Sequence, residues 1–346
     1  MNRLLWQAVV AVTLGTSMAQ AGAQNAELIK QAAAANGGVI IVRDALFESF
    51  HQSMGQAFNA EFKKHGISVR FERMQSGQQF NLYEQELRGG RVSNDIMALV
   101  EPSIFVSLNQ QNKFTPFCSP HNKDYPDWAL GKNCGYFPYV AYFQYLTYNT
   151  DKVKGNDIPR SWQDLADPKW KGKVSLLDPR VGGGNYYFAF SMMKLFGKEW
   201  FDKVRLNDPL LANGHGTVNS QIMSGERLVG VNLSVLVRDF GKFPGGKDAP
   251  VGESYPKEGV TLLVGGMAVT KGGPNPAGAK LFVEWASSLA GQKVIARKGH
   301  ISLRKDYTNE TGDELSKIKF NLWDPDEMLK FRDSWTAETL KLLGGS

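Results

Sequence analysis

The chain has 346 residues, of which 42% are hydrophobic and 21% charged, with a net charge of +6 and a pI near 9.1. This length predicts two domains with a substantial core, and the composition excludes a disordered or fibrous protein. The basic excess is mild, and no run of Lys and Arg alternates with aromatic residues, which argues against nucleic-acid binding. It slightly favours an anionic small ligand over a polyamine.

The N-terminus, residues 1–23, has the pattern of a secretory signal peptide. Arg3 precedes an apolar run from Leu4 to Leu14, and small residues then offer cleavage sites after Ala21 or Ala23. The alternative is a membrane anchor, but this run is too short to span a bilayer, and no later stretch reaches ~18 apolar residues. We therefore expect an exported protein with no stable membrane insertion.

The first half of the mature chain alternates strands and helices. A helix at Ala26 to Ala35 precedes the apolar run Val39 to Val42, which is typical of a strand buried on both faces. The segments that follow predict a helix ending at Gly66, a strand at Ile67 to Phe71, a helix at Phe80 to Leu87 and a strand at Asp95 to Val100. Ligands of such open sheets bind beyond the carboxyl ends of the strands. We therefore expect the strand-end residues to share one ligand site: Arg43, Asp44, Ser76, Gly77, Gln78 and Glu101.

The second half predicts another lobe. The aromatic strand Tyr136 to Tyr148 leads into it, and the strand Gly259 to Val269 returns from it. Between them we expect a short polar helix, a strand at Val174 to Leu177, a helix at Ala189 to Phe196, a strand at Leu228 to Val231 and a loop at 242–250. A helix pair at Ala277 to Arg297 and a helical tail follow. The fold class is therefore α/β, with a first lobe at 24–143 and 260–346, a second at 144–259, and a ligand cleft at the hinge.

The glycine triplet Gly182-Gly183-Gly184 follows a predicted strand and opens a helix. Such a helix start presents backbone N–H groups that bind an anion or a polar ligand. Arg43 and Arg180 could each bind a carboxylate or phosphate through two hydrogen bonds. From this lobe we predict the site residues Arg180, Gly183, Gly184, Asn185 and Tyr186.

The chain contains two cysteines, Cys118 and Cys134, in a stretch rich in Pro, Asn, Asp and Lys. In an oxidising compartment this pair predicts a disulfide closing a surface loop, worth roughly 3 kcal/mol in the chain-entropy model. Zinc is the alternative, with His121 nearby, but a structural zinc site takes about four ligands. We predict the disulfide and no metal.

Three runs resemble a known family. The run SWQDLADPKWKGKVSLLDP is similar to the second-lobe signature of the extracellular solute-binding proteins of ABC importers. The runs NSQIMSGERLVGVNLSVLV and AGAKLFVEWASSLAGQKVIARKGHISLRKD fit the same family. The resemblance implies a type II periplasmic-binding fold, a periplasmic location and a membrane permease as partner. Its branch includes binders of ferric ion, thiamine, polyamines, phosphonates and sugar phosphates, so the ligand depends on the site.

One departure from that branch concerns iron. Its ferric-binding members have a tyrosine pair directly after the strand that ends here at Val231, whereas this chain has Asn232-Leu233-Ser234. We predict that Asn232 and Ser234 offer neutral hydrogen-bonding groups to a ligand instead. A ferric site formed by Tyr186, Tyr187 and Glu101 remains an alternative, as does packing of the Tyr187 ring in the core.

Catalytic motifs are missing from the sequence, which has no G-x-S-x-G, H-E-x-x-H or phosphate-binding P-loop pattern. Of the five histidines, His215 stands out because it lies in a Gly-rich loop before a helix start. We therefore predict a monomeric solute-binding protein, without cofactor or enzymatic activity, that captures a small organic anion. Glu101 could bind an ammonium group of a zwitterion. Ferric ion, a polyamine, or a secreted enzyme on the same scaffold are the alternatives.

Overall fold

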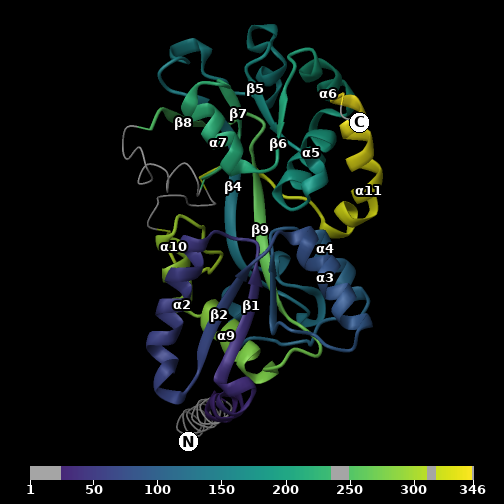
Figure 1. The fold of residues 1–346 in the computed structure, drawn as a ribbon. Coiled ribbons are helices and arrows are strands. Elements are labelled where there is room, and N and C mark those ends of the chain that lie inside the picture. Colours follow the sequence, from purple (N-terminus) through teal and green to yellow (C-terminus); the bar gives the residue numbers. More distant parts are fainter. Residues whose placement is uncertain (1–24, 235–248, 310–316, 345–346) are drawn as a thin grey trace, which may run out of the picture.

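The computed structural model describes residues 25–234, 249–309 and 317–344. The predicted signal peptide at residues 1–23 and most of the predicted loop at 242–250 lie outside the described residues. The described chain folds into two lobes joined by two long strands (Figure 1).

The first lobe is built on three parallel strands in the order β2-β1-β3. These are β1 (Val39–Asp44), β2 (Ser68–Arg73) and β3 (Ile96–Leu99). The helices of this lobe are a first helix at 25–34, then α2 (Glu48–Phe62), α3 (Ser76–Arg88), α4 (Pro102–Gln110), α9 (Pro276–Ser287) and α10 (Leu289–Arg297).

Strand β3 shows why the central strands of this sheet contain continuous apolar runs. Ile96 and Ala98 belong to the core that includes α2 and α9, whereas Met97 and Leu99 pack in a second cluster with α3 and α4. Alternate side chains of a strand point to opposite faces, and helices cover both faces here (Figure 1). The continuous apolar run in the sequence follows from this double burial.

The second lobe repeats this arrangement with the parallel strands β7-β5-β6. Its strands are β5 (Val174–Leu177), β6 (Leu210–Ala212), β7 (Val229–Leu233) and the short β8 (Val251–Ser254). Its helices are α5 (Gly184–Phe196), α6 (Lys198–Arg205) and α7 (His215–Ser224). The predicted polar helix near Ser161 is instead a pair of 3-10 turns, at Trp162–Ala166 and Pro168–Trp170, because Pro168 interrupts the segment.

Two antiparallel strands, β4 (Phe137–Asn149) and β9 (Val260–Val269), connect the lobes. β9 pairs with β3 of the first lobe and β4 pairs with β7 of the second, so one sheet runs through the whole molecule (Figure 1). The two crossings predicted from the sequence are therefore present. The predicted lobe limits fall within β4 and just before β9, and they stay a prediction.

The C-terminal helix α11 (Pro325–Leu342) bridges the lobes. It packs on α4 of the first lobe and on α5 and α6 of the second (Figure 1). The Tyr186 hydroxyl donates to the Met328 carbonyl over 2.7 Å, and the Trp335 and Phe190 rings lie 4.9 Å apart. A two-residue strand, β10 (Phe320–Asn321), pairs with β9 just before this helix.

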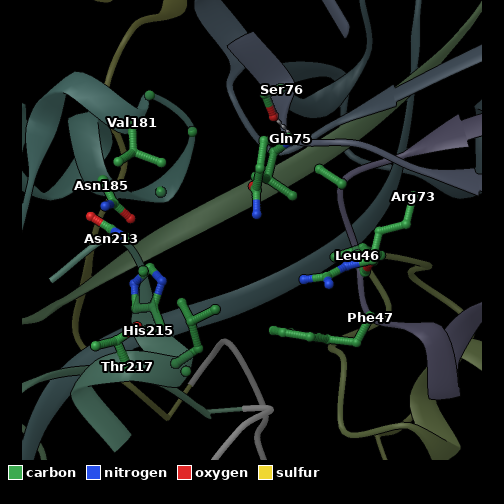
Figure 2. Close-up of a pocket in the computed structure, with 18 of the residues that line it drawn as sticks. Leu46, Phe47, Arg73, Gln75, Ser76, Val181, Asn185, Asn213, His215 and Thr217 are labelled. Carbon is green, nitrogen blue, oxygen red and sulfur yellow. Dashed lines mark hydrogen bonds between the residues drawn. The ribbon is translucent and has the colours of Figure 1, made fainter. Parts of the chain in front are cut away.

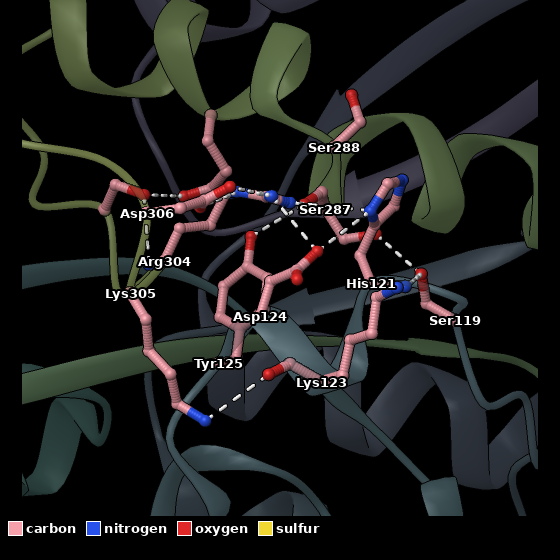
Figure 3. Close-up of polar contacts among 12 residues, drawn as sticks. Ser119, His121, Lys123, Asp124, Tyr125, Ser287, Ser288, Arg304, Lys305 and Asp306 are labelled. Atoms are coloured by element: carbon pink, nitrogen blue, oxygen red, sulfur yellow. Dashed lines mark hydrogen bonds and ion pairs between the residues drawn. The ribbon is translucent and has the colours of Figure 1, made fainter. Parts of the chain in front are cut away.

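The predicted disulfide between Cys118 and Cys134 is present, with Cα atoms 5.0 Å apart. A polar cluster ties its loop to the rest of the lobe (Figure 3). Arg304 donates to Asp124 over 3.0 Å, and the Tyr125 hydroxyl donates to the Ser287 carbonyl over 2.9 Å.

No helix within the described ranges is both long and apolar enough to cross a membrane.

Candidate ligand-binding site

A cavity of about 290 Å³ lies between the two lobes. The first lobe lines it with the loops that follow β1, β2 and β3, the second with the segments that follow β5 and β6 and with the end of β7, and β4 contributes Tyr142 (Figure 2). These are the carboxyl ends of the parallel strands, where open α/β sheets bind ligands. The lining residues are Ala45, Leu46, Phe47, Arg73, Gln75, Ser76, Val100, Tyr142, Val181, Gly182, Gly183, Gly184, Asn185, Asn213, Gly214, His215, Gly216, Thr217 and Leu233.

The second-lobe wall consists of two helix N-termini. α5 begins at Gly184 after Gly182 and Gly183, whose φ angles of 75° and 58° suit glycine. α7 begins at His215 after Gly214, whose carbonyl accepts from the N–H groups of Thr217 and Val218. The first N–H groups of a helix have no acceptor within it, and the positive end of the helix dipole lies there. The start of α7 therefore favours negative charge in the cavity, whereas at α5 the Gly183 N–H already donates to the Glu101 carboxylate.

Arg73 provides the positive charge of the first-lobe wall. Its Nε donates to the Leu46 carbonyl over 3.0 Å, and its guanidinium carbon lies 5.5 Å from the centre of the Phe47 ring. These contacts hold the guanidinium at the cavity (Figure 2). Among the lining residues that the structure describes, none is an Asp or a Glu.

His215 and Tyr142 are the other titratable lining groups of the described chain, and both are uncharged. Burial lowers the pKa of His215 to about 3. Burial, together with the charge of Asp44, raises the pKa of Tyr142 above its ordinary value. The cavity therefore takes its positive character from Arg73 and the start of α7.

Four of the residues predicted from the sequence line this cavity: Ser76, Gly183, Gly184 and Asn185. Gly77 and Gln78 lie beside Ser76 in the first turn of α3 and are not among the lining residues. The Asn185 amide nitrogen donates to the carbonyl of Asp178 over 3.0 Å, so its oxygen is the group left for a ligand.

Glu101 lies behind the cavity wall. Its side chain is fully buried, and its carboxylate accepts hydrogen bonds from Gly183 N–H over 2.6 Å and from Arg332 Nε over 2.5 Å. A carboxylate engaged in this way joins the two lobes. It does not line the cavity, where it was predicted to meet an ammonium group.

Arg43 and Asp44 do not reach the cavity, because β1 continues through both of them. The Arg43 guanidinium is buried and donates to both carboxylate oxygens of Glu86, over 2.9 and 2.8 Å, and to Glu72 over 3.2 Å. Asp44 accepts from Leu46 N–H over 2.9 Å and from the Tyr139 hydroxyl. Both side chains stabilise the first lobe.

Arg180 and the adjacent tyrosines also lie outside the cavity. Arg180 pairs with Asp178 over 2.8 Å. Tyr186 donates to Met328 as described above, and the Tyr187 oxygen accepts from Trp323 N–H over 3.3 Å. Both rings are buried, which raises the pKa of each hydroxyl. None of the three residues of the ferric alternative, Tyr186, Tyr187 and Glu101, is among the lining residues of the cavity.

Asn232 and Ser234 are buried beside the cavity. β7 continues to Leu233, two residues beyond its predicted end, so Asn232 pairs with Tyr145 inside the sheet. Its amide donates to the Asn219 oxygen over 2.8 Å, and the Ser234 oxygen accepts from Phe143 N–H over 3.1 Å. Because side chains alternate along a strand, Leu233 is the residue of this trio that lines the cavity.

Two parts of the cavity lining were not identified from the sequence, Arg73 in the first lobe and the segment 213–217 in the second. Arg73 is the last residue of β2, and the rule that placed Arg43 in the site applies equally to it. The segment from Asn213 to Thr217, which includes the first turn of α7, supplies five lining residues, and only His215 in it was singled out. Its glycines before a helix start were the available signal.

The comparisons with known proteins define the class. Residues 47–293 match the family model of the bacterial extracellular solute-binding proteins, and the chain belongs to this family. It is 23% identical over 269 residues to the iron uptake protein A1 of Synechocystis, covering 74% of each chain. It is 26% identical over 248 residues to an uncharacterized protein of Haemophilus influenzae, covering 68% of this chain and 70% of that one.

Solved structures confirm the predicted type II periplasmic-binding fold. AfuA of Actinobacillus pleuropneumoniae with fructose-6-phosphate bound has a TM-score of 0.77 at 20% identity, covering 89% of this chain and 99% of that one. Iron-bound HitA of Pseudomonas aeruginosa has a TM-score of 0.76 at 20% identity, covering 88% and 98%. Through its family, the chain is a substrate-binding protein of an ABC importer. At these identities the likeness shows the fold and leaves the ligand to the site.

Proposed function

We propose that this protein captures a small organic anion, bearing a phosphate, phosphonate or carboxylate, in the periplasm and delivers it to the permease of an ABC importer. The observation that carries the proposal is the charge of the cavity. Arg73 faces the N-termini of α5 and α7 across it, and the described lining residues include no carboxylate.

The anionic head is held from both lobes. Arg73 forms charge-assisted hydrogen bonds with its oxygens, and the first N–H groups of α7 bind it from the other side. The Ser76 and Thr217 hydroxyls and the Gly183-Gly184-Asn185 segment surround it. A ligand held by groups of both lobes favours the closed form, because only that form brings all its contacts together.

The rest of the solute meets apolar side chains. Leu46, Phe47, Val100, Val181 and Leu233 line the same cavity. With about 290 Å³ of space, the cavity suits a small solute rather than a drug-sized ligand. The combination of a charged wall and an apolar wall fits an organic anion better than an inorganic one.

The alternatives fit this cavity less well. Ferric ion needs several anionic oxygens, and the described lining offers one phenol, Tyr142, whose pKa burial raises. Within the described residues no three His, Cys, Asp or Glu side chains are grouped to hold a metal. A polyamine needs carboxylates. We further propose that the protein is a monomer and performs no catalysis, its function being capture and delivery.

A thermal-shift screen of sugar phosphates, phosphonates, dicarboxylates, spermidine and ferric salt tests the proposal. An anion at 100 times its Kd should stabilise the fold by about 2.7 kcal/mol. We expect Arg73→Met to weaken binding of the best anion by at least about tenfold, as for a lost charge-assisted hydrogen bond. The matched control is Arg70→Met, on the same strand but exposed and paired with Glu72 over 3.2 Å. Equal affinities of the two variants, or preference for spermidine or iron, would refute the proposal.

A further inference from the structure

A buried glutamine on the strand that connects the lobes contacts both helix starts of the cavity. Gln144 of β4 is completely buried. Its amide nitrogen donates to the Gly184 carbonyl at the start of α5 over 2.7 Å and lies 3.0 Å from Nε2 of His215 at the start of α7. One side chain thus links three segments that are far apart in sequence.

The chemistry of Gly184 fixes which end of the Gln144 amide faces His215. A carbonyl oxygen only accepts hydrogen bonds, so the amide atom beside Gly184 must be the nitrogen. The same nitrogen faces Nε2 of His215 with its second hydrogen. An amide nitrogen only donates, so Nε2 must accept and carries no proton. The ring proton therefore resides on the other nitrogen, Nδ1.

We propose that Gln144 is a positioning residue that holds His215 in its neutral Nδ1–H form, so that the ring offers the anion a hydrogen-bond donor without a positive charge. This inference rests on the proposed function for the identity of the ligand. His215 lines the cavity (Figure 2), and its Nδ1–H complements the N–H groups of the helix start that it opens.

The surroundings of His215 agree with a neutral ring. Burial lowers its pKa to about 3. Arg73 stands across the cavity (Figure 2) and disfavours a second positive charge, and Tyr142, which also lines the cavity, is protonated. α7 packs on β4, β5, β6, β7 and β8. Glu253 of β8 is the charged side chain that these strands carry. It lies opposite Thr147 of β4, three residues along the strand from Gln144. The ligand therefore meets a donor whose charge stays constant between pH 5 and 8.

The tautomer itself can be measured without any ligand. Imidazole ¹⁵N NMR of the ligand-free protein should show His215 as Nδ1–H at pH 7 and unchanged at pH 5, with His215→Asn identifying the signals. In Gln144→Leu, which removes the donor, the Nε2–H form should become populated. In Gln144→Glu, whose carboxylate accepts from Nε2–H, the ring should titrate near neutral pH. An Nε2–H or protonated ring in the wild-type protein would overturn the inference, as would an unchanged tautomer in Gln144→Leu.

Binding of sulfate, whose charge is constant over this range, provides the second measurement. By calorimetry we expect the wild-type Kd for sulfate to change less than about twofold between pH 5.5 and 8, and the Gln144→Glu Kd to fall at least about fivefold at the lower pH. A pH-dependent wild-type Kd would contradict the inference. If neither the wild-type protein nor its variants bind sulfate or any organic anion, the proposed function is refuted. The NMR result would still decide the role of Gln144.

Discussion

The carboxylate of Glu101, at the start of α4 in the first lobe, accepts a hydrogen bond of 2.6 Å from the N–H of Gly183 in the second lobe. Its other oxygen accepts from Arg332 of α11. The side chain is fully buried between them. One carboxylate therefore connects both lobes and the C-terminal helix at the edge of the cavity.

We expect Glu101→Gln to destabilise the closed form. A glutamine amide has one acceptor oxygen, so its NH₂ group would face the other donor, either Gly183 N–H or Arg332. That buried donor would lose its acceptor, which costs about 1–3 kcal/mol. Urea unfolding should show this loss, and small-angle scattering should show a larger radius of gyration. The control is Glu327→Gln, which removes a surface pair with Lys194 and should cost less than about 1 kcal/mol. Equal losses in both variants would show that Glu101 does not hold the lobes.

Arg43 and Arg73 should have opposite roles. Arg43→Met leaves the partly buried Glu86 carboxylate without its partner, so we expect a loss of about 1–3 kcal/mol in the free energy of unfolding. The affinity of the folded protein for the anion should stay unchanged. Arg73→Met should weaken binding and leave stability within about 1 kcal/mol, since its side chain is exposed. Calorimetry and urea titration of both variants test the pair, and a loss of affinity in Arg43→Met would place that guanidinium in the site.

Tyr186 should stabilise the fold without binding a ligand. Tyr186→Phe removes the hydrogen bond to the Met328 carbonyl, so we expect a loss of about 1 kcal/mol in stability and an unchanged affinity for the anion. Ferric salt should produce no visible tyrosinate band in the wild-type protein. A band that disappears in Tyr186→Phe would reinstate the iron alternative.

Stability should fall in mild acid because of two buried histidines. His215, whose pKa burial lowers to about 3, contributes to the decline. For His300, burial lowers the pKa in the folded state from 6.5 to about 4. Between these values the unfolded chain binds more protons, so stability is fully present above pH 6.5 and declines as the pH falls toward 4, by at most roughly 1.4 kcal/mol per pH unit. Urea unfolding at pH 7 and pH 5 measures the decline. His300→Gln should reduce it, and an identical decline in that variant would assign it to other groups.

Much of the fold could be predicted from local patterns. The apolar run at Val39 to Val42 indicated a strand covered on both faces, and the pattern of β4 and β9 indicated two crossings between lobes. The glycines before α5 indicated a helix start facing a ligand, and Gly183, Gly184 and Asn185 do line the cavity. These features depend on backbone conformation and periodicity, which nearby residues determine.

Only the tertiary structure decided which side chains reach the cavity. Arg43 and Arg73 both lie at the end of a strand, yet Glu72 and Glu86, 29 and 43 residues away, draw Arg43 away from the ligand site. Glu101 likewise meets Gly183 across the lobes, 82 residues further along the chain. The sequence by itself determined where the chain turns and where donors gather. Whether a charged donor remains available to a ligand depends on the partners that folding brings to it from distant segments. A long charged side chain pairs with an opposite charge that lies within its reach.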